Sequence, residues 1–249
     1  MSARHVLVAL LLGGALIAAA EAPRPYLETV PLPDLMRILP PPPAPGSPRN
    51  LADRAIFRAT RALRGSERWT VATRDVSDAR FTTFACAIGM QLDAKRAPDT
   101  ARVFERIGGG AIVDPVKQGY ATRRPYLDND QPICEPKTEH LATNGDYPSG
   151  HTTNGWSSAL LLAELLPDRA TAILARGREY GESRYICGSH SVSAVEAGYM
   201  SGSVLVATLH AAPDFRRDME AARRELAGLR ASAPPAPAAQ CAQEARALR

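Results

Sequence analysis

The residues best suited to chemistry lie in three short segments that are far apart in the chain. The first is "KQGYATRRP", which contains Lys117 and Arg124, and the second is "PSGH", which covers 148–151. The third is "SRYICGSH", with Arg184 and His190. Cationic side chains bind anions, and histidines exchange protons near neutral pH. Together the three segments could surround a multiply charged anion.

A phosphate-like dianion needs several kinds of donor at once. Guanidinium groups give bidentate contacts, a lysine gives a point charge, and the N-terminus of a helix presents free backbone N–H groups. "PSGH" precedes a helical pattern, in which Gly150 lets the backbone approach the anion and the Ser149 hydroxyl can donate. Taken singly, each segment also fits a helix cap or solvated surface charges. The three together predict one anion site.

The order and spacing of these segments resemble the three-part signature of the type 2 phosphatidic acid phosphatase superfamily. The matching positions are Lys117-x6-Arg124-Pro125, Pro148-Ser149-Gly150-His151 and Ser183-Arg184-x5-His190. The stretches "NGDYPSGHTTNGW" and "AILARGREYGESRYICG" are similar, more narrowly, to the soluble class A bacterial non-specific acid phosphatases. The resemblance covers roughly residues 35 to 225, which is nearly the whole chain after its first segment.

The resemblance implies a mostly helical fold that hydrolyses small phosphate monoesters through a covalent phosphohistidine, with no metal ion and no other cofactor. His190 would be the nucleophile, attacking phosphorus with an unprotonated ring nitrogen. His151 would be the general acid, which protonates the leaving alkoxide and later activates water. Catalysis would depend mainly on positioning and on stabilising charge at the phosphoryl oxygens. The residues implied to bind those oxygens are Lys117, Arg124, Ser149, Gly150 and Arg184.

One position departs from the signature. The signature ends with an aspartate four residues after the histidine, and here residue 194 is alanine. Four residues make one helical turn, so an aspartate at 194 would lie beside His190, fix its tautomer and stabilise its positive ring. Ala194 can do neither, and Ser191 stands where this class usually has tryptophan. If the place is vacant, the enzyme is weakened, and restoring aspartate at 194 raises its activity.

Another carboxylate could fill this role from elsewhere. Glu196 lies about 240° around the helix from His190, so its side chain is expected to point away. Glu182, Asp146 or an ordered water could reach the ring from another segment, and the sequence does not choose among them. Asp146 could also shape the rim of the site together with Tyr147.

The departure leaves a second function open, a phosphate- or phosphoester-binding protein on the same fold that is nearly silent in catalysis. A third is vanadate binding with peroxidase chemistry, since haloperoxidases share the signature, although the surrounding sequence favours the phosphatases.

A membrane lipid phosphatase is disfavoured because no apolar run after residue 20 is long enough to span a bilayer. No nucleic-acid binding is expected either, because the net charge is only +4 and acidic and basic residues are interspersed.

The chain is expected to form a single domain behind an export signal. Residues 1–20 have a short positive end, an apolar run and small residues at the cleavage point, which is typical of a signal peptide. The Pro-rich stretch 21–49 is expected to be an extended arm that lies on the domain and packs in part. Residues 50–230 are expected to form the helical phosphatase domain, and 231–249 a loosely ordered Pro/Ala-rich tail.

The elements that would position the site are helices. Apolar residues recur with helical spacing in segment after segment, alternating strand patterns are absent, and Asn50 is typical of an N-cap. A helix over 98–107 is expected to end at the glycines 108–110, and a helix from His151 is expected to end before Pro167. The predicted fold class is all-α, a single compact helical domain of the acid phosphatase and vanadium haloperoxidase type with a Pro-rich N-terminal arm.

The cysteines indicate an oxidising compartment. Their even number in an exported chain predicts one or two disulfides, but four cysteines allow three full pairings and the sequence does not choose among them. None lies in a CxxC pair, which disfavours a zinc site. The expected location is periplasmic or secreted, with no membrane span after signal removal, and a homo-oligomer is compatible with the sequence. The four are Cys86, Cys134, Cys187 and Cys241.

Overall fold

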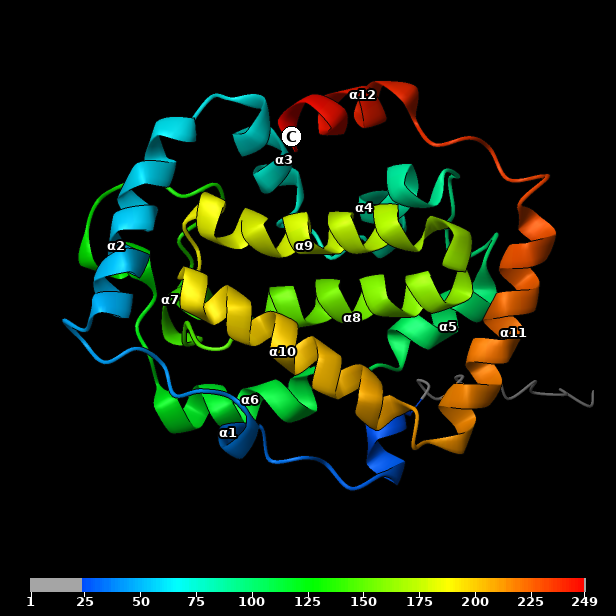
Figure 1. The fold of residues 1–249 in the computed structure, drawn as a ribbon, viewed down its shortest axis with the longest axis horizontal. Coiled ribbons are helices and arrows are strands. Elements are labelled where there is room, and N and C mark those ends of the chain that lie inside the picture. The colour runs from blue at the N-terminus through cyan, green and yellow to red at the C-terminus, as the bar shows by residue number, and fades with distance from the viewer. Residues whose placement is uncertain (1–23, 249) are drawn as a thin grey trace, which may run out of the picture.

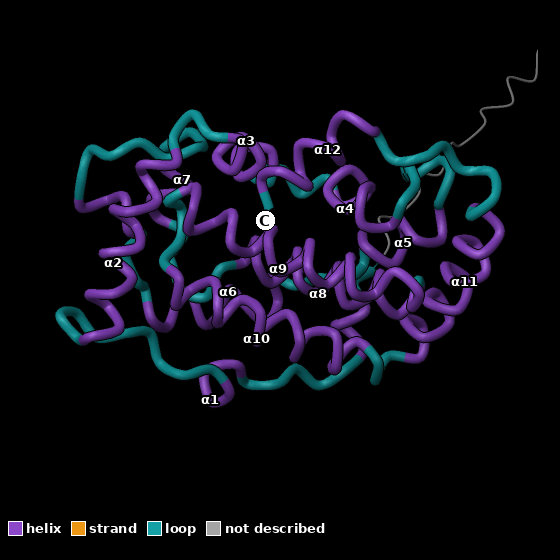
Figure 2. Tube along the Cα trace, turned by 45° about the horizontal axis from the view of Figure 1, so that its top comes forward, coloured by secondary structure: helices purple, strands orange, loops and turns teal. Residues whose placement is uncertain are grey.

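The computed structural model describes residues 24–248, and within them the chain is helical (Figure 1). The described residues contain no strand, only one isolated bridge between Met90 and Pro235, so the predicted all-α class is confirmed (Figure 2). The expected signal peptide lies outside the described residues. The α-helices are α1 (Leu35–Ile38), α2 (Pro48–Thr60), α3 (Glu67–Arg74), α4 (Arg80–Ile88), α5 (Pro98–Glu105), α6 (Gly110–Tyr120), α7 (Glu139–Thr143), α8 (Gly150–Leu165), α9 (Ala170–Cys187), α10 (Val192–Leu209), α11 (Pro213–Leu229) and α12 (Ala238–Ala247). Short 3-10 turns cover Tyr26–Thr29, Arg61–Leu63, Pro125–Asp128 and Pro167–Arg169.

Three long helices, α8, α9 and α10, lie side by side across the middle of the molecule (Figure 1). Each buries residues on several sides, which explains why apolar residues in α8 and α10 are not confined to one stripe. Small residues let the helices approach closely. A Cβ on Gly155 of α8 would lie 2.1 Å from Cδ1 of Tyr180 on α9, and a Cβ on Gly198 of α10 would lie 2.7 Å from Cβ of Thr152. The close packing brings the N-terminus of α8 near the C-terminus of α9.

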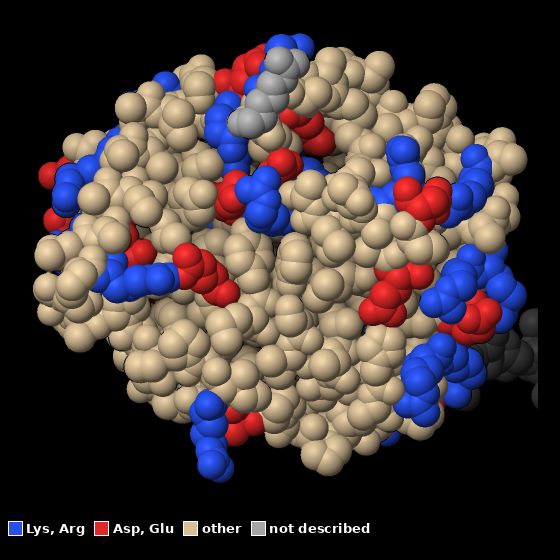
Figure 3. Space-filling model, in the orientation of Figure 1, with Lys and Arg blue, Asp and Glu red and all other residues tan. Residues whose placement is uncertain are grey.

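The remaining helices surround these three. α3 packs on α9, and α11 packs on α5 at the end of the molecule away from α2 (Figure 1). Buried aromatic and aliphatic side chains from α4, α5 and α11 complete the core, among them Phe84, Val103 and Phe215. On the face drawn in Figure 3, basic and acidic side chains lie intermixed around the edge, which fits the interspersed charges of the sequence.

Sequence patterns placed some helix boundaries incorrectly. Ser47, not Asn50, is the N-cap of α2, because its hydroxyl accepts from the Asn50 N–H at 3.3 Å and Pro48 occupies the first turn, where no N–H is needed. The helix over 98–107 ends earlier than expected, at Glu105, and Gly110 begins a new helix, α6. Within the expected domain, α3, α6 and α7 have no counterpart among the expected helices, and neither do α1 in the arm and α12 in the tail. In α6 the pattern is obscured by an internal proline, Pro115.

The Pro-rich arm lies against the domain through selected side chains. Leu35 and Leu39 are buried, whereas Met36 and Ile38, which have the same apolar character, are 41% and 43% exposed. Tyr26 is also buried, and its hydroxyl donates to Asp218 of α11 at 2.7 Å. In the described part of the arm, single buried side chains therefore pack on the domain while their neighbours stay exposed. This part also includes two short helical turns.

The expectation of a loosely ordered tail is wrong. Residues 238–247 form α12, which is tied to α4 by the Cys86–Cys241 disulfide. Two ion pairs hold it to α3: Arg74 with Glu244 at 2.5 Å, and Arg246 with Glu67 at 2.7 Å. Composition alone did not reveal this helix because its stabilising partners lie 155 to 179 residues earlier in the chain.

One described helix, α10, is long and apolar enough by composition to cross a membrane. It packs against α8 and α9, and Ala194, Leu205 and Leu209 on it are fully buried. Its apolar character is therefore accounted for by its position in the protein core.

Removing the disulfide that anchors α12 should detach this helix selectively. We expect replacement of both Cys86 and Cys241 by serine to lower the free energy of unfolding by about 2–5 kcal/mol. Chemical denaturation would measure this loss. Hydrogen exchange should become fast in 238–247 while α8 to α10 keep their protection, and unchanged protection in α12 would contradict the prediction.

Candidate active site

The predicted site residues converge on one cavity of about 380 Å³. The cavity lies where α6, the N-terminus of α8 and the C-terminus of α9 meet, so segments separated by up to 73 positions in the sequence share one space. Ser149 does not line it and is fully buried. The predicted residues that do line it are Lys117, Arg124, Gly150, His151, Arg184 and His190.

A sharp turn after α9 places His190 beside Arg184. Gly188 ends the helix with φ +90°, a conformation that side chains other than glycine rarely adopt, and a Cβ there would lie 2.4 Å from Nη1 of Arg61. The chain then folds back, so that the N–H groups of Ser189 and His190 both donate to the Arg184 carbonyl, at 3.1 and 3.3 Å. Guanidinium and imidazole groups six positions apart therefore reach the same cavity.

Three consecutive backbone carbonyls hold three of the site side chains. The Asn144 carbonyl accepts from Nε of Arg124 at 2.8 Å, the Gly145 carbonyl accepts from Nζ of Lys117, and the Asp146 carbonyl accepts from Nδ1 of His190 at 2.8 Å. Residues 144–146 directly precede the second motif, and this segment, which we call the carbonyl segment, therefore fixes the two cations and the histidine relative to one another.

The hydrogen bonds of His190 define its tautomer. A carbonyl oxygen can only accept, so Nδ1 must carry the proton that it donates to the Asp146 carbonyl. On the other side of the ring, Nη1 of Arg124 lies 3.0 Å from Nε2, and an arginine can only donate. Nε2 is therefore the unprotonated nitrogen and faces the cations of the cavity.

A carboxylate does contact His190, although Ala194 cannot supply it. Oδ1 of Asp146 lies 2.9 Å from Nδ1 of His190, and the Asp146 side chain is buried. Of the alternatives that the sequence left open, the structure therefore shows Asp146, which reaches the ring from the loop before α8. The other two acidic residues are engaged elsewhere: Glu182 pairs with Arg178, and Glu196 pairs with Arg49.

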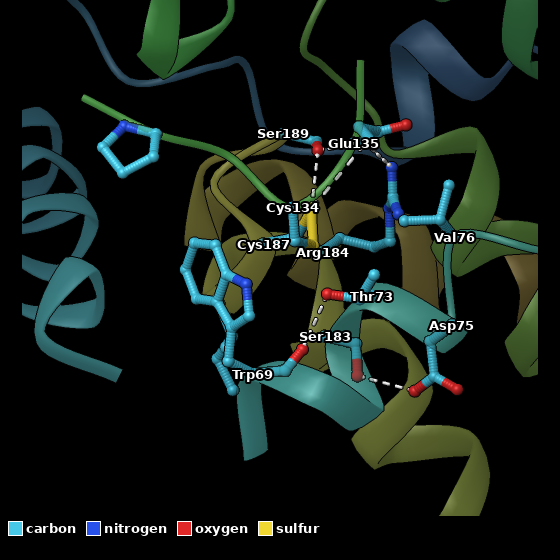
Figure 4. Close-up of a disulfide and its surroundings, with 12 residues drawn as sticks. Trp69, Thr73, Asp75, Val76, Cys134, Glu135, Ser183, Arg184, Cys187 and Ser189 are labelled. Carbon is cyan, nitrogen blue, oxygen red and sulfur yellow. Dashed lines mark hydrogen bonds and ion pairs between the residues drawn. A yellow bond between two sulfur atoms is a disulfide. The ribbon is translucent and has the colours of Figure 1, made fainter. Parts of the chain in front are cut away.

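Glu135 holds the guanidinium of Arg184. Oε1 of Glu135 accepts from Nη2 of Arg184 at 2.5 Å and from the Ser189 hydroxyl (Figure 4). Glu135 follows Cys134, which forms a disulfide with Cys187 in the last turn of α9. This disulfide therefore keeps Glu135 beside Arg184.

Arg184 keeps donors free for a ligand. It is 1% exposed, and its Nε and Nη1 atoms have no hydrogen-bond partner among the described residues. Leaving a buried donor unpaired costs about 1–3 kcal/mol, and an anionic oxygen in the cavity would satisfy it. The unpaired donors fit the predicted oxyanion site.

The second motif forms the N-terminus of α8. Ser149 is its N-cap, and the Ser149 oxygen accepts from the N–H of Thr152 at 3.2 Å and from the Thr152 hydroxyl at 2.9 Å, which leaves the Ser149 proton available for donation. His151 follows in the first turn, and its Nε2 atom lies 2.7 Å from the Val76 carbonyl, which can only accept. Nδ1 is therefore the nitrogen of His151 that can exchange a proton.

Comparison with known proteins identifies the family. Residues 104–218 match the model of the PAP2 superfamily. The chain is 47% identical over 207 residues to an acid phosphatase of Zymomonas mobilis, a match that covers 80% of this chain and 78% of that protein. The chain belongs to the PAP2 superfamily. It is also 37% identical over 212 residues to a non-specific acid phosphatase of Providencia stuartii (82% of this chain, 86% of that protein) and 33% identical over 233 residues to one of Salmonella typhimurium (91% and 93%). The resemblance found in the motifs is confirmed.

Burial and mutual repulsion tune the ionisable groups of this PAP2 site. Burial, with the charges of Arg124, Lys117 and Arg184, lowers the pKa of His190 well below its ordinary value, so the ring is neutral. Burial and the charge of Arg124 lower the pKa of Lys117 to about 8. Burial and the charge of Arg184 also lower the pKa of His151.

Glu135 behaves in the opposite way. Burial opposes its ionisation, but the charge of Arg184 and the hydrogen bonds from Ser189 and Arg184 outweigh burial, so the pKa of Glu135 lies below its ordinary value. The carboxylate is therefore ionised and neutralises part of the positive charge of the cavity.

Sequence reasoning missed several residues of the cavity. Glu135 carried no motif, and its proximity to a cysteine became informative only once the Cys134–Cys187 pairing was known. Asp114, His140 and Asn154 also line the cavity, and no spacing pattern connected them with the three motifs. Ser183, which the signature includes, lies outside it and donates to Asp75 at 2.7 Å, tying α9 to the end of α3.

Anion binding should weaken as the pH rises past about 8, because free Lys117 then loses its positive charge. Below that pH the ammonium group is present and attracts the anion. Sulfate is a suitable probe since it stays a dianion from about pH 6 to about pH 10, and calorimetry would give its affinity, which should fall by up to about tenfold per pH unit above the pKa.

Lys117→Met provides the control. This variant should bind sulfate more weakly below about pH 8 and should lack the decline above it, since the titrating group has been removed. Wild-type affinity that stays constant across this range, or an equal decline in the variant, would show that Lys117 does not contribute the charge.

Proposed function

We propose that this chain is an acid phosphatase that hydrolyses small phosphate monoesters through a phosphohistidine on His190, without a metal ion. The observation that carries the proposal is the state of His190: its Nε2 atom is unprotonated and faces a cavity lined by Lys117, Arg124 and Arg184. An unprotonated ring nitrogen is a nucleophile, and the three cations would hold a phosphoryl group in front of it. The relatives named acid phosphatase support the substrate class.

In the binding step the cavity takes up the phosphoryl group of the monoester. The free donors of Arg184 and the charge of Lys117 bind its oxygens, and Arg124 moves its Nη1 contact from the histidine to the ligand. The N-terminus of α8 adds backbone N–H groups from Gly150 onward. These contacts neutralise the dianion and align phosphorus with Nε2.

The reaction then proceeds in two balanced transfers. The lone pair on Nε2 of His190 forms a bond to phosphorus while the bond from phosphorus to the alkoxide oxygen breaks. His151 starts this step as an imidazolium, with protons on both ring nitrogens, and gives its Nδ1 proton to the alkoxide. Because the pKa of His151 is lowered, acidic pH favours this charged form. In the second transfer a water molecule attacks phosphorus and loses a proton to His151. The nitrogen–phosphorus bond breaks, and inorganic phosphate leaves with both histidines restored.

The alternative of a nearly silent phosphate-binding protein rests on Ala194. The contact between Asp146 and His190 removes its main support, because the ring does have a carboxylate beside it.

The proposed location is the periplasm or the extracellular space. Two disulfides favour an oxidising compartment, and residues 1–20 have the composition of a signal peptide.

Turnover of p-nitrophenyl phosphate by purified protein tests the proposal. We expect activity that resists EDTA and falls by about 10⁴-fold or more in His190→Ala, since the nucleophile is lost. His210→Ala is the matched control, because His210 is half-exposed and pairs with Glu164 outside the cavity.

A phosphohistidine trapped by alkaline quenching in the wild type, and absent in His190→Ala, would identify the intermediate. Micromolar phosphate binding without any turnover would overturn the proposal in favour of the phosphate-binding protein. Turnover that survives His190→Ala would exclude His190 as the nucleophile.

A further inference from the structure

We propose that Asp146 is the positioning residue for the nucleophile, in place of the aspartate that the signature carries at 194. This inference rests on the proposed function of His190. It assigns to the loop before α8 a role that the signature gives to α10.

Both oxygens of the Asp146 carboxylate are committed to the turn that contains His190. Oδ1 lies 2.9 Å from Nδ1 of His190 and accepts from the N–H of Ser191 at 3.1 Å. Oδ2 accepts from the Ser191 hydroxyl at 2.6 Å. Three donors therefore fix the carboxylate, which leaves it little freedom to turn away from the ring.

The carboxylate also lies at the N-terminus of α10. Ser191 is the N-cap of this helix, and residue 194 is its third helical position. A carboxylate at that position often reaches back to the N–H of the N-cap residue. Asp146 accepts from that same N–H, although it comes from a segment 45 residues earlier. Asp146 therefore both caps the N-terminus of α10 and contacts the ring of His190.

The two departures from the signature are consistent with this arrangement. The Ser191 hydroxyl accepts from the N–H of Ala194 at 3.2 Å and donates to Asp146, and a tryptophan at 191 could not do this. Ala194 is fully buried and has no polar side-chain group to satisfy. Both residues are thus suited to a carboxylate that arrives from outside the helix.

The negative charge matters because His190 has cations around it. When Nε2 attacks phosphorus the ring becomes positive, and Lys117, Arg124 and Arg184 all disfavour that charge. Asp146 is in direct contact with the ring and offsets them. Burial raises the pKa of Asp146 to about 6, against the Ser191 hydrogen bond and the Arg124 charge, so the carboxylate is ionised at neutral pH.

The tautomer does not depend on this charge. The backbone carbonyl of Asp146 accepts from Nδ1 as well, at 2.8 Å, and stays in place whatever the side chain is. In serine proteases, neutralising the orienting aspartate costs about 10⁴ in turnover because the wrong tautomer forms. Here we expect a smaller loss, about 10²- to 10³-fold, since only the charge stabilisation disappears.

The decisive variant is Asp146→Asn, which keeps the shape and removes the charge. With p-nitrophenyl phosphate we expect kcat to fall by about 10²- to 10³-fold while KM and the inhibition constant of phosphate change by less than about threefold. The exchange variant Asp146→Ala/Ala194→Asp, which conserves composition, should exceed Asp146→Ala alone by at least about tenfold in kcat. Ala194→Asp alone should not raise kcat, because Asp146 already contacts the ring.

Asp53→Asn is the matched control for a purely structural role. Asp53 is also buried, and its Oδ1 accepts from the N–H of Ser193 at 3.1 Å at the same end of α10, without contacting His190. This variant should lose stability and keep kcat.

Unchanged kcat in Asp146→Asn would overturn the inference. So would a higher kcat in Ala194→Asp, or a loss in Asp146→Asn that Asp53→Asn reproduces. Failure of the proposed function would differ, since wild-type turnover would then be absent or would survive His190→Ala.

Discussion

The burial of three cationic side chains around one small cavity is the constraint on which the rest of the structure depends. Lys117, Arg124 and Arg184 are all less than 8% exposed, and burying a charge without compensation costs several kcal/mol. Neutral carbonyl groups hold Lys117 and Arg124, whereas Glu135 pairs with Arg184. Carbonyl oxygens fix a cation without cancelling its charge. Among the residues that line the cavity, three cations face two carboxylates, Glu135 and Asp114, so a positive excess remains for an anion and the cations are ordered before it arrives.

The fold supplies this arrangement by bringing helix ends together. The close contacts at Gly155 and Gly198 pack α8 against α9 and α10, so the N-terminus of α8 meets the turn between the other two helices. That turn carries His190, and the N-terminus of α8 carries His151. The two disulfides act in different places: Cys134–Cys187 lies directly behind Glu135 and Arg184, whereas Cys86–Cys241 holds α12 on the outside of the molecule. One disulfide shapes the site, and the other secures the chain end.

The sequence predicted the helical class because helical periodicity is a local signal. It predicted the convergence of the three motifs from their shared anion-binding chemistry and from their resemblance to a known signature. It did not predict the contacts that join distant segments. Asp146 was one of three possibilities for the histidine partner, since a separation of 44 residues leaves no periodic trace. Glu135 was missed because its role depends on a disulfide pairing that cysteine positions alone do not determine. The tail was misjudged for the same reason, as α12 depends on partners in α3 and α4.

In the proposed mechanism, the position of Asp146 also changes how binding and catalysis are related. An aspartate on α10 would support the histidine from a helix that holds no phosphate-binding cation. Asp146 instead belongs to the carbonyl segment, whose backbone holds Lys117 and Arg124. The same loop therefore contacts the proposed nucleophile and two of the cations. The proposed chemistry is favoured by a negative charge at Nδ1 of His190, and that charge need not come from a particular helix. In this chain that charge comes from the segment that also orders the cations.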